Sequence, residues 1–331
     1  MSRPHSESVF QRRPAMLGVT IAGVLLSGLV VHMALVGQFA VIIGPQGSPD
    51  EFRIAVVHCL LAGYFPAAYF ALRRGAADTL DRLGGLFASA PGSKQSERGG
   101  NSRRWSLLAW GLVGVAATVM TPTLTTAEPW RSSTWPPEVW WHRFVGLFIG
   151  WWFYWFIAEA IATGTSTSRL ADRLENVDLF DQRPMSPFVK QGLLTALLTV
   201  GAVSLISLML VDPGEWPVVA LTLGLCLPVA VLGLLLPVRG VHRRIRDAKQ
   251  SELVWARDRI RCVRKSLHEG VPEGSPGKMA DLIAYQRLVE DVSEWPFQAS
   301  TAVQIGLYLL IPAASWLGGL VIEGLLSRFL R

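Results

Sequence analysis

The chain has little cysteine, with three residues among 331. Cys59 and Cys226 lie inside long apolar runs, and Cys262 lies in a strongly basic segment. Small secreted domains that are stapled by disulfides carry many more cysteines, spaced through their loops. We therefore expect no disulfide framework.

Familiar catalytic signatures are also missing. The sequence contains no Walker loop, no HExxH or GxSxG motif, no Rossmann fingerprint and no cluster of Cys and His at metal-ligand spacing. An enzyme would need a site of another kind. We therefore leave enzymatic activity open and favour a non-enzymatic protein.

Ionisable residues are rare inside the apolar runs, where they are His32, His58, Glu159 and Glu323. The two glutamates lie near the ends of their runs. Ion-coupled transporters usually carry ionisable groups near the middle of the membrane. Secondary active transport is therefore less favoured.

Apolar sequence, in contrast, is abundant: 50% of the residues are hydrophobic, and several apolar runs are near 20 residues long. At 1.5 Å per residue such a run crosses a hydrocarbon layer of about 30 Å. The pattern predicts an all-α, polytopic membrane protein with seven transmembrane helices. The predicted spans are Ala15 to about Gly44, Arg53 to Leu72, Trp105 to about Thr123, about Trp141 to Ala162, Val189 to Val211, Trp216 to Pro237, and about Val303 to Leu326.

The basic residues indicate the orientation of these spans. With the N-terminus inside, 26 Lys and Arg flank the inner ends of the spans and 5 lie outside. This is the bias that the positive-inside rule describes, so we expect the C-terminus outside. The basic surplus then needs no nucleic-acid partner to explain it.

The segment between the sixth and seventh spans predicts a cytoplasmic helical hairpin. An exit helix follows Pro237, VPEGSPGK forms the turn, and a return helix follows it. Apolar residues recur every three or four positions in both helices and predict an antiparallel seam. The seam residues are Leu253, Ala256, Ile260, Val263 and Leu267 in the first helix and Leu282, Tyr285, Val289 and Val292 in the second. The chain thus divides into a six-span bundle (1–237), the hairpin (238–302), and a closing span with a short outer tail (303–331).

His32 and His58 are candidate cofactor ligands. The first two spans are antiparallel, and both histidines lie roughly 8–12 Å from the outer ends of their spans. If the helices are adjacent, the imidazoles can bind haem or a metal as a pair. The alternative is that each histidine hydrogen-bonds a neighbouring helix.

The fourth span carries a run of aromatic residues that includes Trp151, Trp152 and Trp155. Tryptophan is typical of membrane interfaces, whereas these three lie near or beyond the middle of the span. They are candidates to line a pocket for a flat apolar ligand such as a lipid or quinone. Ordinary packing between helices is the alternative.

Small residues predict close contacts between helices. They occur at Gly18 and Ala22, at Gly23 and Ser27, and in a GxxxG motif at Gly146 and Gly150. In the seventh span, Pro312 followed by Gly318 and Gly319 predicts a kink that can act as a gating hinge or only shape the packing.

The C-terminal third resembles uncharacterised bacterial multi-pass inner-membrane proteins. The resemblance rests on Trp295-Pro296-Phe297, Tyr308-Leu309-Leu310-Ile311-Pro312, Ser315-Trp316-Leu317-Gly318-Gly319, and the earlier PVRGVHRRIRDAK. It implies a location in the bacterial inner membrane and implies no activity.

The function that we favour from the sequence is an oligomeric channel-like, sensory or scaffold module in contact with membrane lipids. A homo-oligomer or another membrane protein is the expected partner. The alternatives are a transporter or carrier of an apolar ligand and a membrane redox subunit that binds haem or metal.

Overall fold

The computed structural model describes residues 13–36, 49–84, 100–125, 137–172, 174, 178–181, 183–209, 216–269, 276–296, 303 and 307. The regular elements among them are all helical, as the sequence predicts. They are α2 (Pro14–Val36), α4 (Pro49–Gly84), α6 (Gly100–Thr125), α7 (Pro137–Ala171), the short 3₁₀ helix η2 (Arg183–Met185), α8 (Ser186–Ser207), α9 (Trp216–His268) and α10 (Pro276–Asp291).

Four stretches of the described residues are long and apolar enough to cross a membrane: Pro14–Leu35, Phe52–Leu83, Trp140–Ala171 and Arg183–Ser207. They coincide with the first, second, fourth and fifth predicted spans. A shorter apolar stretch of α6, Trp105–Met120, coincides with the third. The sixth predicted span is the first part of α9, and the seventh lies outside the described residues except for positions 303 and 307.

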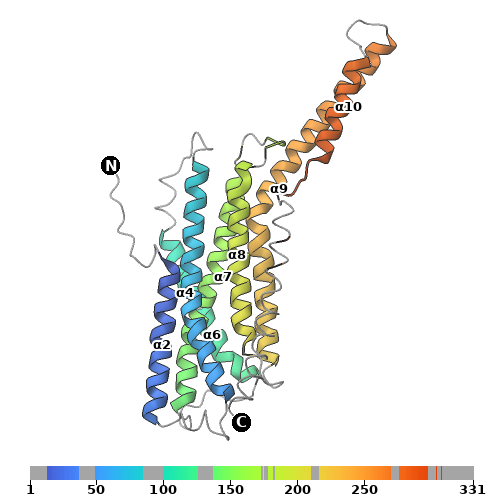
Figure 1. Cartoon of the computed structure of the whole chain (residues 1–331). Coiled ribbons are helices and arrows are strands. Elements are labelled where there is room, and N and C mark those ends of the chain that lie inside the picture. The colour runs from blue at the N-terminus through green and yellow to red at the C-terminus, as the bar shows by residue number, and fades with distance from the viewer. Residues whose placement is uncertain are drawn as a thin grey trace, which may run out of the picture.

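Helix α4 is central to the bundle and packs against α2, α7 and α8 (Figure 1). Its buried face meets apolar residues of α7, α8 and α9 in one core. This core consists of Val57, Leu61, Phe65, Ala68, Leu72, Phe156, Ile157, Ala160, Ala202, Ile206 and Val229. Tyr64 adds a hydrogen bond of 2.6 Å from its hydroxyl to the carbonyl oxygen of Leu198 in α8.

Small residues bring the helices into close contact, as predicted at two of the three sites. A Cβ on Gly63 of α4 would overlap the backbone of Gly18 in α2, and a Cβ on Gly114 of α6 would overlap the backbone of Gly150 in α7. Gly23 and Ser27 are exposed on the opposite side of α2, and Gly23 makes no close helix contact among the described residues. Within the described part of the chain, the Gly18 side of α2 is the one that lies close to α4.

Helix α9 is 53 residues long, or about 80 Å. It contains Pro228 and Pro237 without ending at either, so the predicted boundary between residues 237 and 238 lies inside one continuous helix. Figure 1 shows α9 running past the ends of its neighbours, with α10 at its side. We call α9 from Arg239 onward, together with α10, the arm.

A second core lies where α9 leaves the bundle. It gathers Leu83 of α4, Ala171 of α7, Phe188 of α8 and Val289 of α10, along with residues of the α7–α8 connection. The full set of its buried members is Leu83, Ala171, Leu174, Leu179, Met185, Phe188, Val241, Ile245 and Val289, and we call it the base core. It fixes the root of the arm to three helices of the bundle, α4, α7 and α8.

Within the arm, α10 packs against α9. The residues predicted to form the seam are buried or half-buried, whereas Arg257, Arg261, Arg264 and Lys265 are exposed. Lys249 of α9 donates hydrogen bonds to the carbonyl oxygens of Glu290 at 2.7 Å and Val292 at 2.8 Å, where α10 ends. An ammonium there satisfies carbonyls that lack partners within the helix.

Candidate functional site

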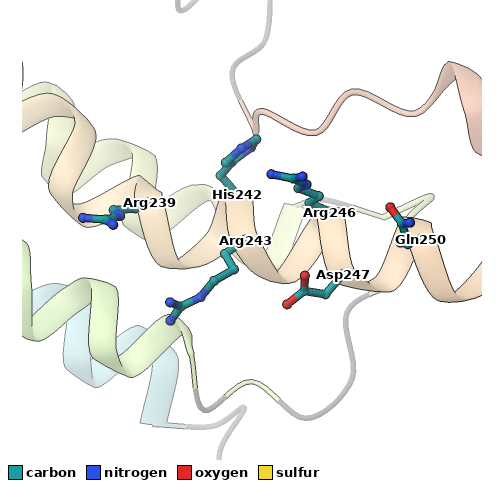
Figure 2. A pocket seen from close by; sticks show the side chains of 6 residues that line it. All are labelled: Arg239, His242, Arg243, Arg246, Asp247 and Gln250. Atoms are coloured by element: carbon teal, nitrogen blue, oxygen red, sulfur yellow. The ribbon is translucent and has the colours of Figure 1, made fainter.

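A strongly charged cavity lies on α9, at the root of the arm. It has a volume of about 490 Å³ (Figure 2). Its lining residues are Arg239, His242, Arg243, Arg246, Asp247 and Gln250. Their spacing of three and four places them on one face of the helix, which we call the basic face.

Packing of the opposite face leaves the arginines of the basic face at the surface. Val238, Val241 and Ile245 have no exposed surface, and the last two belong to the base core. Because α9 is a rigid helix, burial of one side fixes the direction of the other. Arg239, Arg243 and Arg246 are accordingly exposed.

Asp172, just after the end of α7, holds two arginines of α9. Its carboxylate forms an ion pair with Arg243, and its backbone carbonyl accepts a hydrogen bond from the guanidinium of Arg244. Arg239 and Arg246 form no ion pair with any residue that the structure describes. Asp247 is the one carboxylate in the cavity lining, against three guanidinium groups, so the cavity favours an anion.

His242 links the basic face to the segment that follows α10. Its imidazole stacks on the indole of Trp295, with ring centroids 4.1 Å apart and ring planes 12° from parallel. Its Nδ1 also lies 3.0 Å from the carbonyl oxygen of Glu294, which places the hydrogen on Nδ1 as donor. A ligand bound at the basic face would therefore contact His242, which holds the segment after α10 against the root of the arm.

On the N-terminal side of Arg239, the same face of α9 is apolar. Val231, Leu232 and Leu235 are 48%, 46% and 37% exposed, and they continue the spacing of three and four toward the bundle. Exposed aliphatic side chains of this kind suit contact with the acyl chains of a lipid. One continuous stripe thus changes from hydrocarbon-like to cationic within about two turns, which is the chemistry of a site for an anionic amphiphile.

The predicted ligand pair His32 and His58 is not the pair that the structure records. His58 of α4 meets His142 of α7, with their Nδ1 atoms 3.2 Å apart. His32 is half-buried on α2, and no contact between it and His58 is found among the described residues. The prediction from the sequence did not include His142, although this histidine lies near the outer end of the fourth predicted span.

The three tryptophans of the predicted pocket pack against neighbouring helices. Trp152 and Trp155 each lie 5.7 Å from the ring of Tyr69, and Trp151 lies against Gly111 of α6. An apolar groove of about 450 Å³ lies instead between α2 and α7. It is lined by Thr20, Ile21, Val24, Leu25, Trp141, Phe144, Val145 and Phe148.

The predicted hinge at Pro312, Gly318 and Gly319 lies outside the described residues. No protein-family model, curated protein or solved structure matches the chain.

Proposed function

We propose that the protein is a non-enzymatic, multi-pass membrane scaffold or sensor that binds the headgroup of an anionic phospholipid at the basic face of α9. The observation that carries the proposal is the continuity of that face. Exposed Val231, Leu232 and Leu235 lead directly to exposed Arg239 and Arg243 on the same side of one helix. Acyl chains suit the first part, and a phosphate suits the second.

Binding at this position would act on the arm. The headgroup would neutralise guanidinium groups at the root of a helix that continues to His268. It would also lie beside His242, whose stack with Trp295 holds the segment after α10 against α9. The amount of bound lipid would then determine how ordered the arm is. Through this change the protein would sense the composition of the membrane.

The test counts bound lipids on the purified full chain by native mass spectrometry, with phosphatidylglycerol against phosphatidylcholine. The double variant Arg239→Gln/Arg246→Gln should lose its preference for phosphatidylglycerol. Each basic residue near an anionic surface contributes about 1 kcal/mol, so the expected loss is about 2 kcal/mol, or roughly thirtyfold in affinity.

The matched control is Arg259→Gln/Arg264→Gln, which removes the same charge from exposed positions farther along α9. It should keep the preference of the parent. An equal loss in both double variants would mean that net charge alone attracts the lipid, and the proposed site would be wrong. Inorganic phosphate should not displace the lipid, because it lacks the acyl chains.

We also propose seven spans, an inside N-terminus and a cytoplasmic arm in the bacterial inner membrane, on the strength of the 26 to 5 distribution of basic residues. Cys262 is an exposed native probe on α9. In a Cys59→Ser/Cys226→Ser background, an impermeant maleimide should label it only after the cells are opened. Labelling in sealed cells would place the arm outside.

A carrier of an apolar ligand is the second candidate, because the groove between α2 and α7 is wide enough for one and is almost wholly apolar. A brominated fatty acid that quenches the fluorescence of Trp141 would support it. Loss of the quenching in Trp141→Phe, with the other tryptophans in place, would identify the residue.

A further inference from the structure

Two histidines from different helices face each other inside the bundle. His58 of α4 and His142 of α7 lie with their Nδ1 atoms 3.2 Å apart, ring centroids 5.2 Å apart and ring planes at 56°. Both side chains are half-buried. The pair is separate from the basic face of α9 and plays no part in the function proposed above.

The helices that carry the pair are fixed against each other. Phe65 of α4 packs on Phe153 of α7 at 5.0 Å between ring centroids, and Tyr69 packs on Trp152 at 5.7 Å. Along α4, Phe65 and Tyr69 lie two to three turns from His58. The separation of the imidazoles is therefore set by the packing of α4 on α7, and the pair is preorganised.

The two Nδ1 atoms lie at hydrogen-bond distance, and the same distance also suits two ligands of one metal ion. A neutral imidazole has one N–H donor and one bare nitrogen acceptor, so two bare Nδ1 atoms at this distance would repel. Either one Nδ1 carries a hydrogen that it donates to the other, or a cation accepts both lone pairs. Tetrahedral zinc, with bonds of about 2.0–2.1 Å to nitrogen, holds two such atoms about 3.3–3.4 Å apart.

We propose that His58 and His142 form a binding site for a first-row transition metal ion, Zn²⁺ or Cu²⁺, through their Nδ1 atoms. Imidazole nitrogen is a preferred ligand for both ions. Among the described residues no group of three or more His, Cys, Asp or Glu side chains could hold a metal. Within the described residues the ion would have these two protein ligands, and its other positions would take water or a small molecule.

The experiment uses the full chain, purified in detergent without a polyhistidine tag and stripped with a chelator. Zn²⁺ and Cu²⁺ are titrated in turn, and bound metal is counted per chain by elemental analysis. The parent should bind one ion. His58→Ala and His142→Ala should each weaken binding by at least roughly tenfold, because even a lost outer partner of a ligand costs that much.

His32→Ala is the matched control, since His32 belongs to the same end of the bundle and does not join the pair. It should bind like the parent. His142→Gln keeps the size and the hydrogen-bonding ability of the side chain, and its melting temperature without metal should equal that of the parent. Zn²⁺ should raise the melting temperature of the parent and of His32→Ala and leave that of His142→Gln unchanged.

Two results would overturn the site. The first is a parent that binds neither ion, which would leave a hydrogen bond between the imidazoles as the whole role of the pair. The second is equal binding by the parent, His58→Ala and His142→Ala, which would place the ion elsewhere. Neither result would argue against the proposed lipid site on α9.

Discussion

The imidazole of His242 lies flat on the indole of Trp295, with 4.1 Å between the ring centroids. The two residues are 53 positions apart in the chain. Their contact returns the segment after α10 to the root of the arm, beside the arginines of the basic face. The arm is therefore closed at its base by an aromatic contact and near the end of α10 by Lys249.

Replacing Trp295 with alanine should release this closure. A stacked aromatic pair contributes about 0.5–1.5 kcal/mol beyond the area it buries. Amide hydrogen exchange in residues 292–295 should become roughly two- to tenfold faster in the variant. Trp105→Ala removes an indole that is 67% exposed on α6 and should leave exchange in 292–295 unchanged.

Gly18→Leu should separate α2 from α4. A Cβ at Gly18 would lie 2.9 Å from both the Gly63 carbonyl oxygen and the Ala67 Cβ, closer than packed atoms allow. Overpacking of this kind costs typically about 1–3 kcal/mol, measurable as a lower unfolding midpoint in detergent. Gly23→Leu on the same helix has open space around it and is the control. Equal midpoints for the two variants would contradict the packing of α2.

Val289→Asp should detach α10 from α9. Val289 has no exposed surface, and it packs in the base core with Leu253 and Tyr285. Losing its burial costs about 1.5–3 kcal/mol, and a carboxylate there is also desolvated. Limited proteolysis should cut residues 276–291 faster. Leu288→Asp changes the neighbouring residue, which is 59% exposed, and should leave the cutting rate near that of the parent.

The contact between α9 and α10 should weaken at alkaline pH. The Tyr285 hydroxyl donates a hydrogen bond of 3.0 Å to the Glu252 carboxylate. Burial, this hydrogen bond and the charge of Glu252 raise the pKa of Tyr285 above its ordinary value. The fold therefore favours the neutral phenol, and the stabilisation is complete below about pH 10 and is lost as the pH rises through the higher folded pKa. Proteolysis of α10 should accelerate over that range in the parent and show no such step in Tyr285→Phe.

The sequence was sufficient for the local structure. Runs near 20 apolar residues and the spacing of three and four predict the helices, because a helix satisfies its own backbone in lipid and a periodic stripe must be buried. The seam from Leu253 to Val292 and the motif at Gly146 and Gly150 were identifiable for the same reason. Each of these patterns is recognised within a single helix, from residues a few turns apart.

Tertiary structure decided which of several equivalent surfaces meet. Gly18 and Gly23 offer the same small-residue pattern, yet only Gly18 lies against α4. His32 and His58 matched in depth, yet the partner of His58 is His142, 84 positions along the chain. The basic residues after Pro237 gave an orientation, but the cationic face exists because Val241 and Ile245 are buried on the other side of α9. The rotation of each helix about its axis is set by all its neighbours at once, and periodicity within one helix carries no information about them.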